Sequence, residues 1–327
     1  GALPDRDRAD LQRTLADIVV DPEARARHLA QAHAAPDAEA ADAIAAGAQR
    51  ASERGAQDAA ADLAEAALRL TPTDDPSLVG QRTMAAAVYL ARSGELHRAR
   101  MLCEQLLPTI GGGPPRVALL RLIGEIHLQE DSVEEGIERL EQAAAEAGAA
   151  PDQRLPIDLL LTYALINELR PREAVTHARR AVSDARRLAI PPLIATALAV
   201  LELSRFFVGL RPRTFRTEEA LAMEVEGSGG PALFRPSLIV ATLETMSGRH
   251  RAAGVKLEKV AAEARVLGDE ASLVPALMYV SWNATFAGDM DSATRAASSS
   301  SRFLTSSISC LVSLLVESGW LSLEPSR

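Results

Sequence analysis

The stretch Gly248-Arg249-His250-Arg251-Ala252-Ala253 contains the pattern that decides the fold, a glycine followed five positions later by an alanine. The pattern recurs along the chain, with some substitution at either position. The pairs are Gly55/Ala60, Gly94/Ala99, Asp131/Gly136, Leu169/Ala174, Gly209/Thr214, Gly248/Ala253 and Gly288/Ala293. Their first members are 39, 37, 38, 40, 39 and 40 residues apart. A near-constant period of this size is typical of stacked helical hairpins.

Composition agrees with an all-α protein. The 327 residues are 47% hydrophobic but only 3% aromatic, and alanine, the strongest helix former, dominates. We predict A helices, which end just before the turns, over residues 37–53, 76–92, 115–129, 155–168, 192–208, 235–247 and 271–287. We predict B helices, which follow the turns, over residues 56–70, 95–107, 133–147, 171–188, 214–225, 250–267 and 290–304. Prolines between the hairpins fit helix starts.

Small residues recur where the two helices of a hairpin are expected to cross. One stands seven positions before each turn and another five after it, as in Ala48 and Ala60 around Gly55. Glu202 breaks this rule. This spacing resembles the tetratricopeptide repeat, in which a small residue is followed seven positions later by a glycine and five positions after that by an alanine. The resemblance covers residues 37–305. The period exceeds the usual length of about 34 residues and most large consensus residues are missing.

A second resemblance rests on residues 11–72. It is carried by Leu15-Ala16-Asp17, Pro22 to Ala30, Pro36-Asp37, Arg54-Gly55-Ala56 and Leu70-Thr71-Pro72. In their order and spacing, these motifs resemble the segment that joins the ATPase module to the helical sensor region in large ATP-binding regulators of the LuxR type. From the repeat register and the apolar C-terminal stretch we expect an N-terminal helical linker or cap at 1–35, repeats at 36–305 and a terminal helix at 306–327. Because the sequence has no GxxxxGK[ST] phosphate loop and no basic terminal domain, the resemblance implies the sensor region alone.

The net charge and the cysteine content indicate which kinds of binding partner and which cellular compartment to expect. The net charge of −9 argues against direct nucleic-acid contact by this segment. Cys103 and Cys310 lie far apart, which favours a reducing cytoplasm. The most apolar window, 191–210, contains Glu202 and Arg205, so we expect no membrane contact.

The sequence offers little for catalysis. The run Gly111-Gly112-Gly113 lacks a following Lys-Ser/Thr pair and is interpreted as a turn. No two of the six histidines are spaced i, i+4, and the acidic residues form no distinctive pair. We therefore expect no enzyme activity, no cofactor and no metal.

The repeat register predicts a strip of A-helix residues on the concave face of the stack. Large apolar members alternate with polar ones along this strip. The candidate groove residues are Arg121, Glu125, Tyr163, Asn167, Phe206, Met278 and Trp282. A small amphipathic molecule, or a protein or peptide helix, would fit such a strip. The alternative is that these side chains pack between neighbouring hairpins.

These observations favour a non-catalytic ligand-sensing or protein-interaction domain of a LuxR-type regulator. Groove binding would change superhelical pitch or contacts between copies of the chain, so a homo-oligomer is one open option. The alternatives are a stand-alone scaffold for a partner protein and, less favoured, a helical-repeat enzyme or phosphatase. The basic stretch Arg170 to Arg187 fits either a solvated helix face or a patch for an acidic partner.

Overall fold

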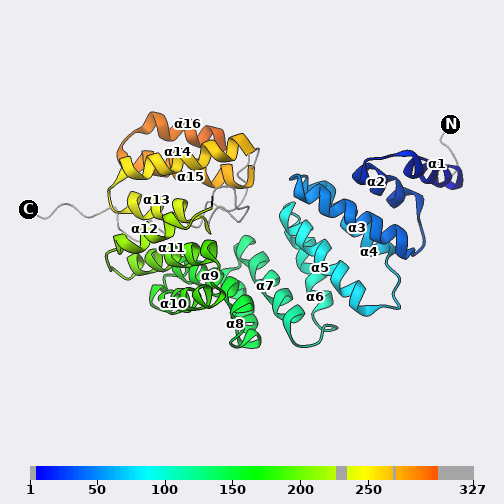
Figure 1. The fold of residues 1–327 in the computed structure, drawn as a ribbon, viewed down its shortest axis with the longest axis horizontal. Coiled ribbons are helices and arrows are strands. Elements are labelled where there is room, and N and C mark those ends of the chain that lie inside the picture. The colour runs from blue at the N-terminus through cyan, green and yellow to red at the C-terminus, as the bar shows by residue number, and fades with distance from the viewer. Residues whose placement is uncertain (1–4, 226–233, 268–269, 301–327) are drawn as a thin grey trace, which may run out of the picture. The chain divides into compact units, whose positions relative to one another are not determined.

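The computed structural model describes residues 5–225, 234–267 and 270–300, which form sixteen α-helices and no strand (Figure 1). The chain divides into two compact units, Gly1–Glu130 and Asp131–Arg327. Unit 1 contains α1 (Asp5–Ile18), α2 (Pro22–Ala32), α3 (Ala38–Glu53), α4 (Gln57–Leu70), α5 (Pro76–Arg92), α6 (Leu96–Leu106) and α7 (Pro114–Gln129). Unit 2 contains α8 (Val133–Ala147), α9 (Pro151–Asn167), α10 (Pro171–Leu188), α11 (Pro191–Phe207), α12 (Thr214–Ala222), α13 (Pro236–Met246), α14 (His250–Leu267), α15 (Glu270–Ala287) and α16 (Met290–Ser300).

The fourteen helices from α3 to α16 confirm the predicted A and B helices. Most boundaries agree within two residues. The largest difference at a helix start is in α9, which begins at Pro151, where proline suits the first helical turn, and carries Pro156 inside. Helices α1 and α2 occupy the expected N-terminal segment, and α2 packs on α3. The terminal helix expected at 306–327 lies outside the described residues.

The turns between A and B helices have the backbone that the repeated pattern requires. All seven predicted turn residues adopt positive φ angles, from 54° at Leu169 to 86° at Gly55 and Gly94. This left-handed conformation ends an α-helix and costs glycine nothing, whereas a side chain makes it unfavourable. In the first turn the Ala56 N–H donates to the Ala51 carbonyl over 2.9 Å, which closes the helix end. The period therefore marks the C-terminal ends of the A helices.

Most of the small crossing residues are buried, as expected. In the first two hairpins Ala48, Ala60, Ala87 and Ala99 are at most 1% exposed. The expectation is wrong at Thr214, which is exposed because α12 begins there, five residues after the turn instead of two.

Glu202 accounts for this delay. Its side chain is fully buried, and its carboxylate accepts the Arg213 N–H over 2.7 Å and the Arg216 guanidinium over 3.0 Å. The carboxylate thus stands at the position that small residues occupy in the other hairpins, and it binds Arg213 just before α12 and Arg216 in its first turn.

No helix among the described residues is both long enough and apolar enough to cross a membrane.

Candidate functional site

Aromatic side chains of unit 2 form two groups of ring contacts, one along α15 and one between α9 and Phe234, which lies just before α13. We call Tyr163, Phe234, Tyr279, Trp282 and Phe286 the aromatic cluster. On α15, Trp282 packs against Tyr279 with ring centroids 5.8 Å apart and against Phe286 at 5.5 Å. These three residues stand at i, i+3 and i+7, so their rings follow one another along one side of the helix. Phe286 remains 38% exposed, so the cluster reaches the surface.

Tyr163 of α9 is half-buried, and its link to the α15 rings is an electrostatic interaction with Tyr279. Its ring meets Phe234 edge-on, with centroids 5.1 Å apart and planes at 80°. The Thr196 hydroxyl of α11 donates to the Phe234 carbonyl over 3.0 Å and holds that residue in place. Burial raises the pKa of the Tyr163 phenol well above its usual value, and nearby Tyr279 raises it further. Burial also raises the pKa of Tyr279 to about 12, although its hydrogen bond with Thr242 acts in the opposite direction.

The sequence-predicted candidates of unit 2 other than Tyr163 lie on α9, α11 and α15. Met278 and Trp282 are partly buried and pack against the core formed by residues such as Leu238 and Leu257. Phe206 packs on Phe207 at 6.0 Å near the end of α11. Asn167 is half-buried in the last turn of α9. All four side chains are partly buried, which is compatible with the groove interpretation and with the packing interpretation alike.

Arg121 and Glu125 belong to unit 1. They lie one turn apart on α7 and form an ion pair over 3.2 Å, each about one-third exposed. An i, i+4 pair of this exposure contributes little to stability.

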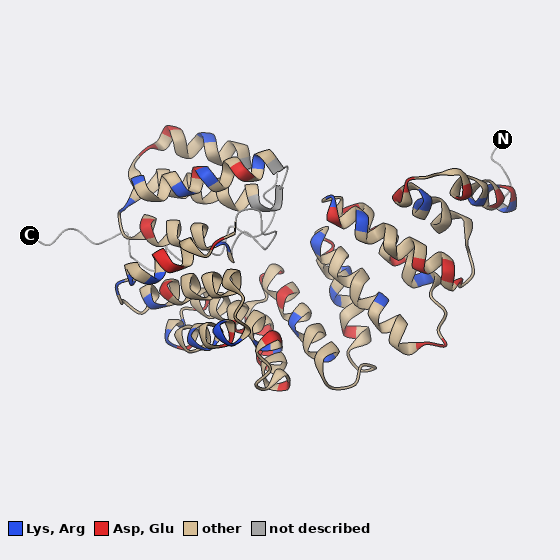
Figure 2. Ribbon diagram, in the orientation of Figure 1, with Lys and Arg blue, Asp and Glu red and all other residues tan. Residues whose placement is uncertain are grey.

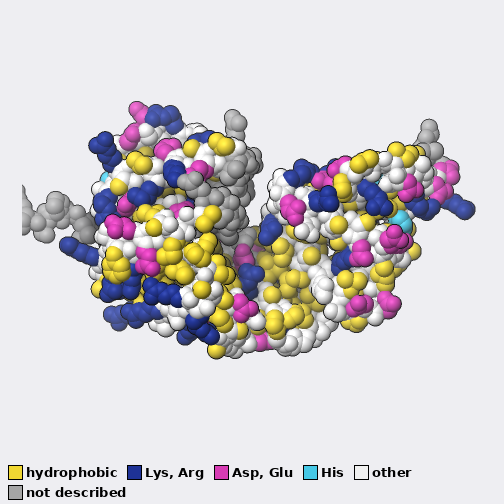
Figure 3. Space-filling model, in the orientation of Figure 1, with side chains coloured by type: hydrophobic (Ala, Val, Ile, Leu, Met, Phe, Trp, Pro, Cys, Tyr) yellow, Lys and Arg dark blue, Asp and Glu magenta, His cyan; other side chains and the backbone are white. Residues whose placement is uncertain are grey.

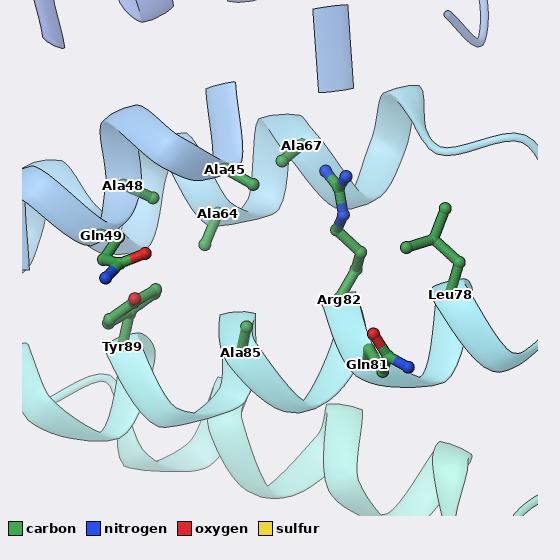
Figure 4. A pocket seen from close by; sticks show the side chains of 10 residues that line it. All are labelled: Ala45, Ala48, Gln49, Ala64, Ala67, Leu78, Gln81, Arg82, Ala85 and Tyr89. Atoms are coloured by element: carbon green, nitrogen blue, oxygen red, sulfur yellow. The ribbon is translucent and has the colours of Figure 1, made fainter. Parts of the chain in front are cut away.

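Unit 1 also contains a pocket between α3, α4 and α5, with a volume of about 260 Å³ (Figure 4). Five alanines leave the space, and longer side chains border it. The lining residues are Ala45, Ala48, Gln49, Ala64, Ala67, Leu78, Gln81, Arg82, Ala85 and Tyr89. Tyr89 and Gln49 lie at one end, and Leu78 and Arg82 at the other (Figure 4). Both terminal nitrogens of Arg82 are already engaged, with the Ala41 carbonyl and Asp42.

The buried carboxylates of unit 2 have structural partners. Asp158 of α9 is fully buried and accepts hydrogen bonds from Arg154 over 3.1 Å and from His177 of α10 over 2.6 Å. Its partners therefore come from both α9 and α10, and the partners of Glu202 likewise come from two neighbouring helices. A buried carboxylate requires such partners to offset the cost of removing its charge from water. Among the described residues, no three His, Cys, Asp or Glu side chains gather in a way that could hold a metal.

Sequence reasoning missed three members of the cluster. Tyr279 and Phe286 stand one helical turn either side of Trp282, so helical spacing was a signal that could have found them. Phe234 lies in the connection between α12 and α13, where no periodicity applies. The pocket residues of unit 1 carry no signal beyond alanine content.

No known family model matches this sequence, and no curated protein sequence matches it. Its fold is nevertheless similar to that of solved structures. A tetratricopeptide repeat protein from Parabacteroides merdae is 12% identical, covers 84% of this chain and 97% of its own, and has a TM-score of 0.52. A Rap protein complexed with competence and sporulation factor is 12% identical, covers 89% and 79%, and has a TM-score of 0.58.

A third similar structure is a signal transduction ATPase with numerous domains and a tetratricopeptide repeat sensor, from Pyrococcus horikoshii. It is 11% identical, covers 98% of this chain but only 47% of its own, and has a TM-score of 0.51. At these identities the likeness concerns the fold. The chain is an all-α, tetratricopeptide-like solenoid, as the repeat pattern predicted.

Proposed function

We propose that this chain is a non-catalytic recognition domain that binds an apolar or amphipathic ligand at the aromatic cluster of unit 2. The observation that carries the proposal is the meeting of Tyr163 from α9 with Phe234, close to Tyr279 on α15. Aromatic side chains supply large apolar contact areas, and a few polar groups among them fix a ligand's orientation. Asn167 and the tyrosine hydroxyls are the polar groups in question.

The wider role proposed here is that of a cytoplasmic sensor region in a LuxR-type transcriptional regulator. It is supported by the resemblance of residues 11–72 to the linker of that family. The likeness to the tetratricopeptide repeat sensor of a signal transduction ATPase agrees with it. Reading the gene on both sides of this segment tests the role. ATPase and helix-turn-helix sequences should flank it, and their absence would count against it.

The mechanism follows from the contacts of Phe234. A ligand ring that contacts Tyr163 competes with Phe234 for the same surface. Arg235, the next residue, donates to Glu224 over 2.7 Å and also pairs with Glu263 of α14. Displacing Phe234 would therefore disturb the ion pairs that join α12, α13 and α14. A ligand shifts such an equilibrium only by the difference between its affinities for the two states.

Tryptophan fluorescence offers a direct test. Substituting Trp320→Phe leaves Trp282 as the one tryptophan of the chain. Titration with small amphipathic acids and with apolar peptides should then change the emission of Trp282, and Tyr163→Ala or Phe286→Ala should weaken the response about tenfold. Phe215→Ala is the matched control, because Phe215 is an aromatic residue of α12 that is 61% exposed and outside the cluster.

The same titration separates the proposal from its alternative. Binding of a whole partner protein that both cluster variants leave unchanged would favour a stand-alone scaffold. It would also remove the aromatic cluster as the site.

A further inference from the structure

One edge of unit 2 carries arginines at three successive turns. The tetrapeptide Leu-Arg-Pro-Arg occurs twice, at 169–172 between α9 and α10 and at 210–213 between α11 and α12. The next turn, between α13 and α14, reads Arg249-His250-Arg251. We call these six residues the arginine edge: Arg170, Arg172, Arg211, Arg213, Arg249 and Arg251. All six are exposed.

The repeat places these turns beside one another. Helix α11 packs on both α10 and α13, so the three hairpins are stacked neighbours. Because every A helix ends at its turn, the three turns lie at the same end of the stack. Lys and Arg gather along this margin of α10 to α14, at the left of Figures 2 and 3. Helices pack about 8 to 10 Å apart, so arginines of adjacent helices follow at similar steps.

Little within the chain neutralises this charge. Arg170 forms an ion pair with Glu173 over 2.8 Å. The side chains of the other five arginines form no ion pair or hydrogen bond within the described part of the chain. This contrasts with the net charge of −9 for the whole chain. Unpaired charges of one sign on one edge steer and orient a partner of the opposite sign.

Apolar side chains interleave with the arginines. Leu169 is 65% exposed, Leu210 is 45% exposed and Phe215, at the start of α12, is 61% exposed. Leu169 also holds a left-handed backbone, φ 54°, where five other turns use glycine. Three exposed apolar side chains next to the arginines supply apolar contact area for a partner.

We propose that the arginine edge docks an acidic segment of a partner protein that carries apolar side chains between its carboxylates. Carboxylates pair with the arginines, and Leu169, Leu210 and Phe215 receive the apolar groups. A nucleic acid fits less well. Phosphate contacts make no use of exposed Leu169, Leu210 and Phe215, whereas the apolar side chains of a peptide do. This surface is separate from the aromatic cluster and does not depend on it.

The test uses a fluorescein-labelled peptide of Glu-Glu-Leu repeats, with binding followed by anisotropy at low ionic strength. Combining Arg172→Glu, Arg211→Glu and Arg249→Glu should weaken binding about tenfold or more, since each reversal removes an attraction and adds a repulsion. The matched control combines Arg179→Glu, Arg265→Glu and Arg295→Glu, three exposed arginines away from the edge with the same change in net charge. The control should keep affinity within about threefold.

A second variant separates specific docking from simple charge attraction. Leu169→Ser with Leu210→Ser should weaken binding of the Glu-Glu-Leu peptide several-fold and leave that of a polyglutamate peptide unchanged. Equal affinities of the edge and control variants would overturn the proposal. The leucine variant would also overturn the proposal if it lost affinity for both peptides equally. A third contradicting result would be a single-stranded DNA oligonucleotide that binds more tightly than the peptide and whose binding the edge variant abolishes. Tyr163→Ala should leave peptide binding at the edge intact, which keeps this result distinct from the test of the aromatic cluster.

Discussion

The ring of Phe234 packs edge-on against the ring of Tyr163, although 71 residues separate them in the sequence. The pair joins a residue just before α13 to the C-terminal half of α9. Its T-shaped geometry directs the positive edge of one ring toward the negative face of the other, which is the favoured arrangement for aromatic pairs. The contact therefore holds Phe234, just before α13, against α9.

Phe234→Ala should lower the free energy of unfolding by about 1 to 3 kcal/mol, from the lost ring contact and the lost apolar burial. Urea denaturation measures the change. Adding Tyr163→Ala and completing a double-mutant cycle should give a coupling energy of about 0.5 to 1.5 kcal/mol. Strictly additive effects of the two substitutions would contradict a direct interaction.

Position 169 is predicted to be one where glycine gives a more stable fold than the leucine present. Its left-handed backbone costs a non-glycine residue about 1 to 2 kcal/mol, and the side chain is mostly exposed, so little burial is lost. Leu169→Gly should raise unfolding stability by about 0.5 to 1 kcal/mol after the extra chain entropy of glycine is subtracted. Thermal denaturation should show a higher midpoint.

Replacing a turn glycine by alanine, the reverse of Leu169→Gly, provides the control for this prediction. Gly94 has φ 86° and open space around it, so Gly94→Ala should cost about 1 to 2 kcal/mol through backbone strain alone. Gly111 is equally open but has no left-handed backbone, and Gly111→Ala should be close to neutral. A neutral Gly94→Ala would show that the turn relaxes to another conformation.

Glu202 is predicted to be far more sensitive to substitution than an exposed carboxylate of unit 2. Glu202→Ala leaves Arg205, Arg216 and the Arg213 N–H without their buried acceptor. Breaking a buried pair in this way costs about 3 to 5 kcal/mol. Glu173→Ala, at a largely exposed carboxylate paired with Arg170, should cost less than about 1 kcal/mol. Equal losses in the two variants, measured by urea denaturation, would contradict this account.

The sequence predicted the helices because their signals are local and repeated. A turn residue with positive φ and a small crossing residue recur about every 39 positions. The helix boundaries assigned in one hairpin could therefore be checked against those of the next. The candidate site was predicted in part for the same reason. Tyr163, Met278 and Trp282 stand at repeat positions, whereas the contact of Tyr163 with Phe234 depends on an irregular connection that no period describes. Glu202 was recognised as an exception, but its effect on the start of α12 required the positions of Arg213 and Arg216.

The buried tyrosines predict a loss of stability in alkaline solution. Burial raises the pKa of Tyr279 to about 12, above its value in the unfolded chain. The neutral phenol is favoured in the folded state, so this contribution is complete below about pH 10 and is lost as pH rises toward 12. Its size is on the order of 2 kcal/mol. Urea denaturation across this range should show the loss, and Tyr279→Phe should reduce it.

Cys103 is predicted to be unreactive while the chain is folded. It is fully buried in α6, and this burial, with Glu104 beside it, raises the pKa of its thiol to about 12. Because the thiolate is the reactive form, both its scarcity and its inaccessibility protect it. In a Cys310→Ser background, Ellman's reagent at pH 8 should react with Cys103 at least about a hundredfold more slowly in buffer than in denaturant. Reaction at equal rates would mean that the contacts of α6 with α5 and α7 open frequently in solution, because those contacts cover the thiol.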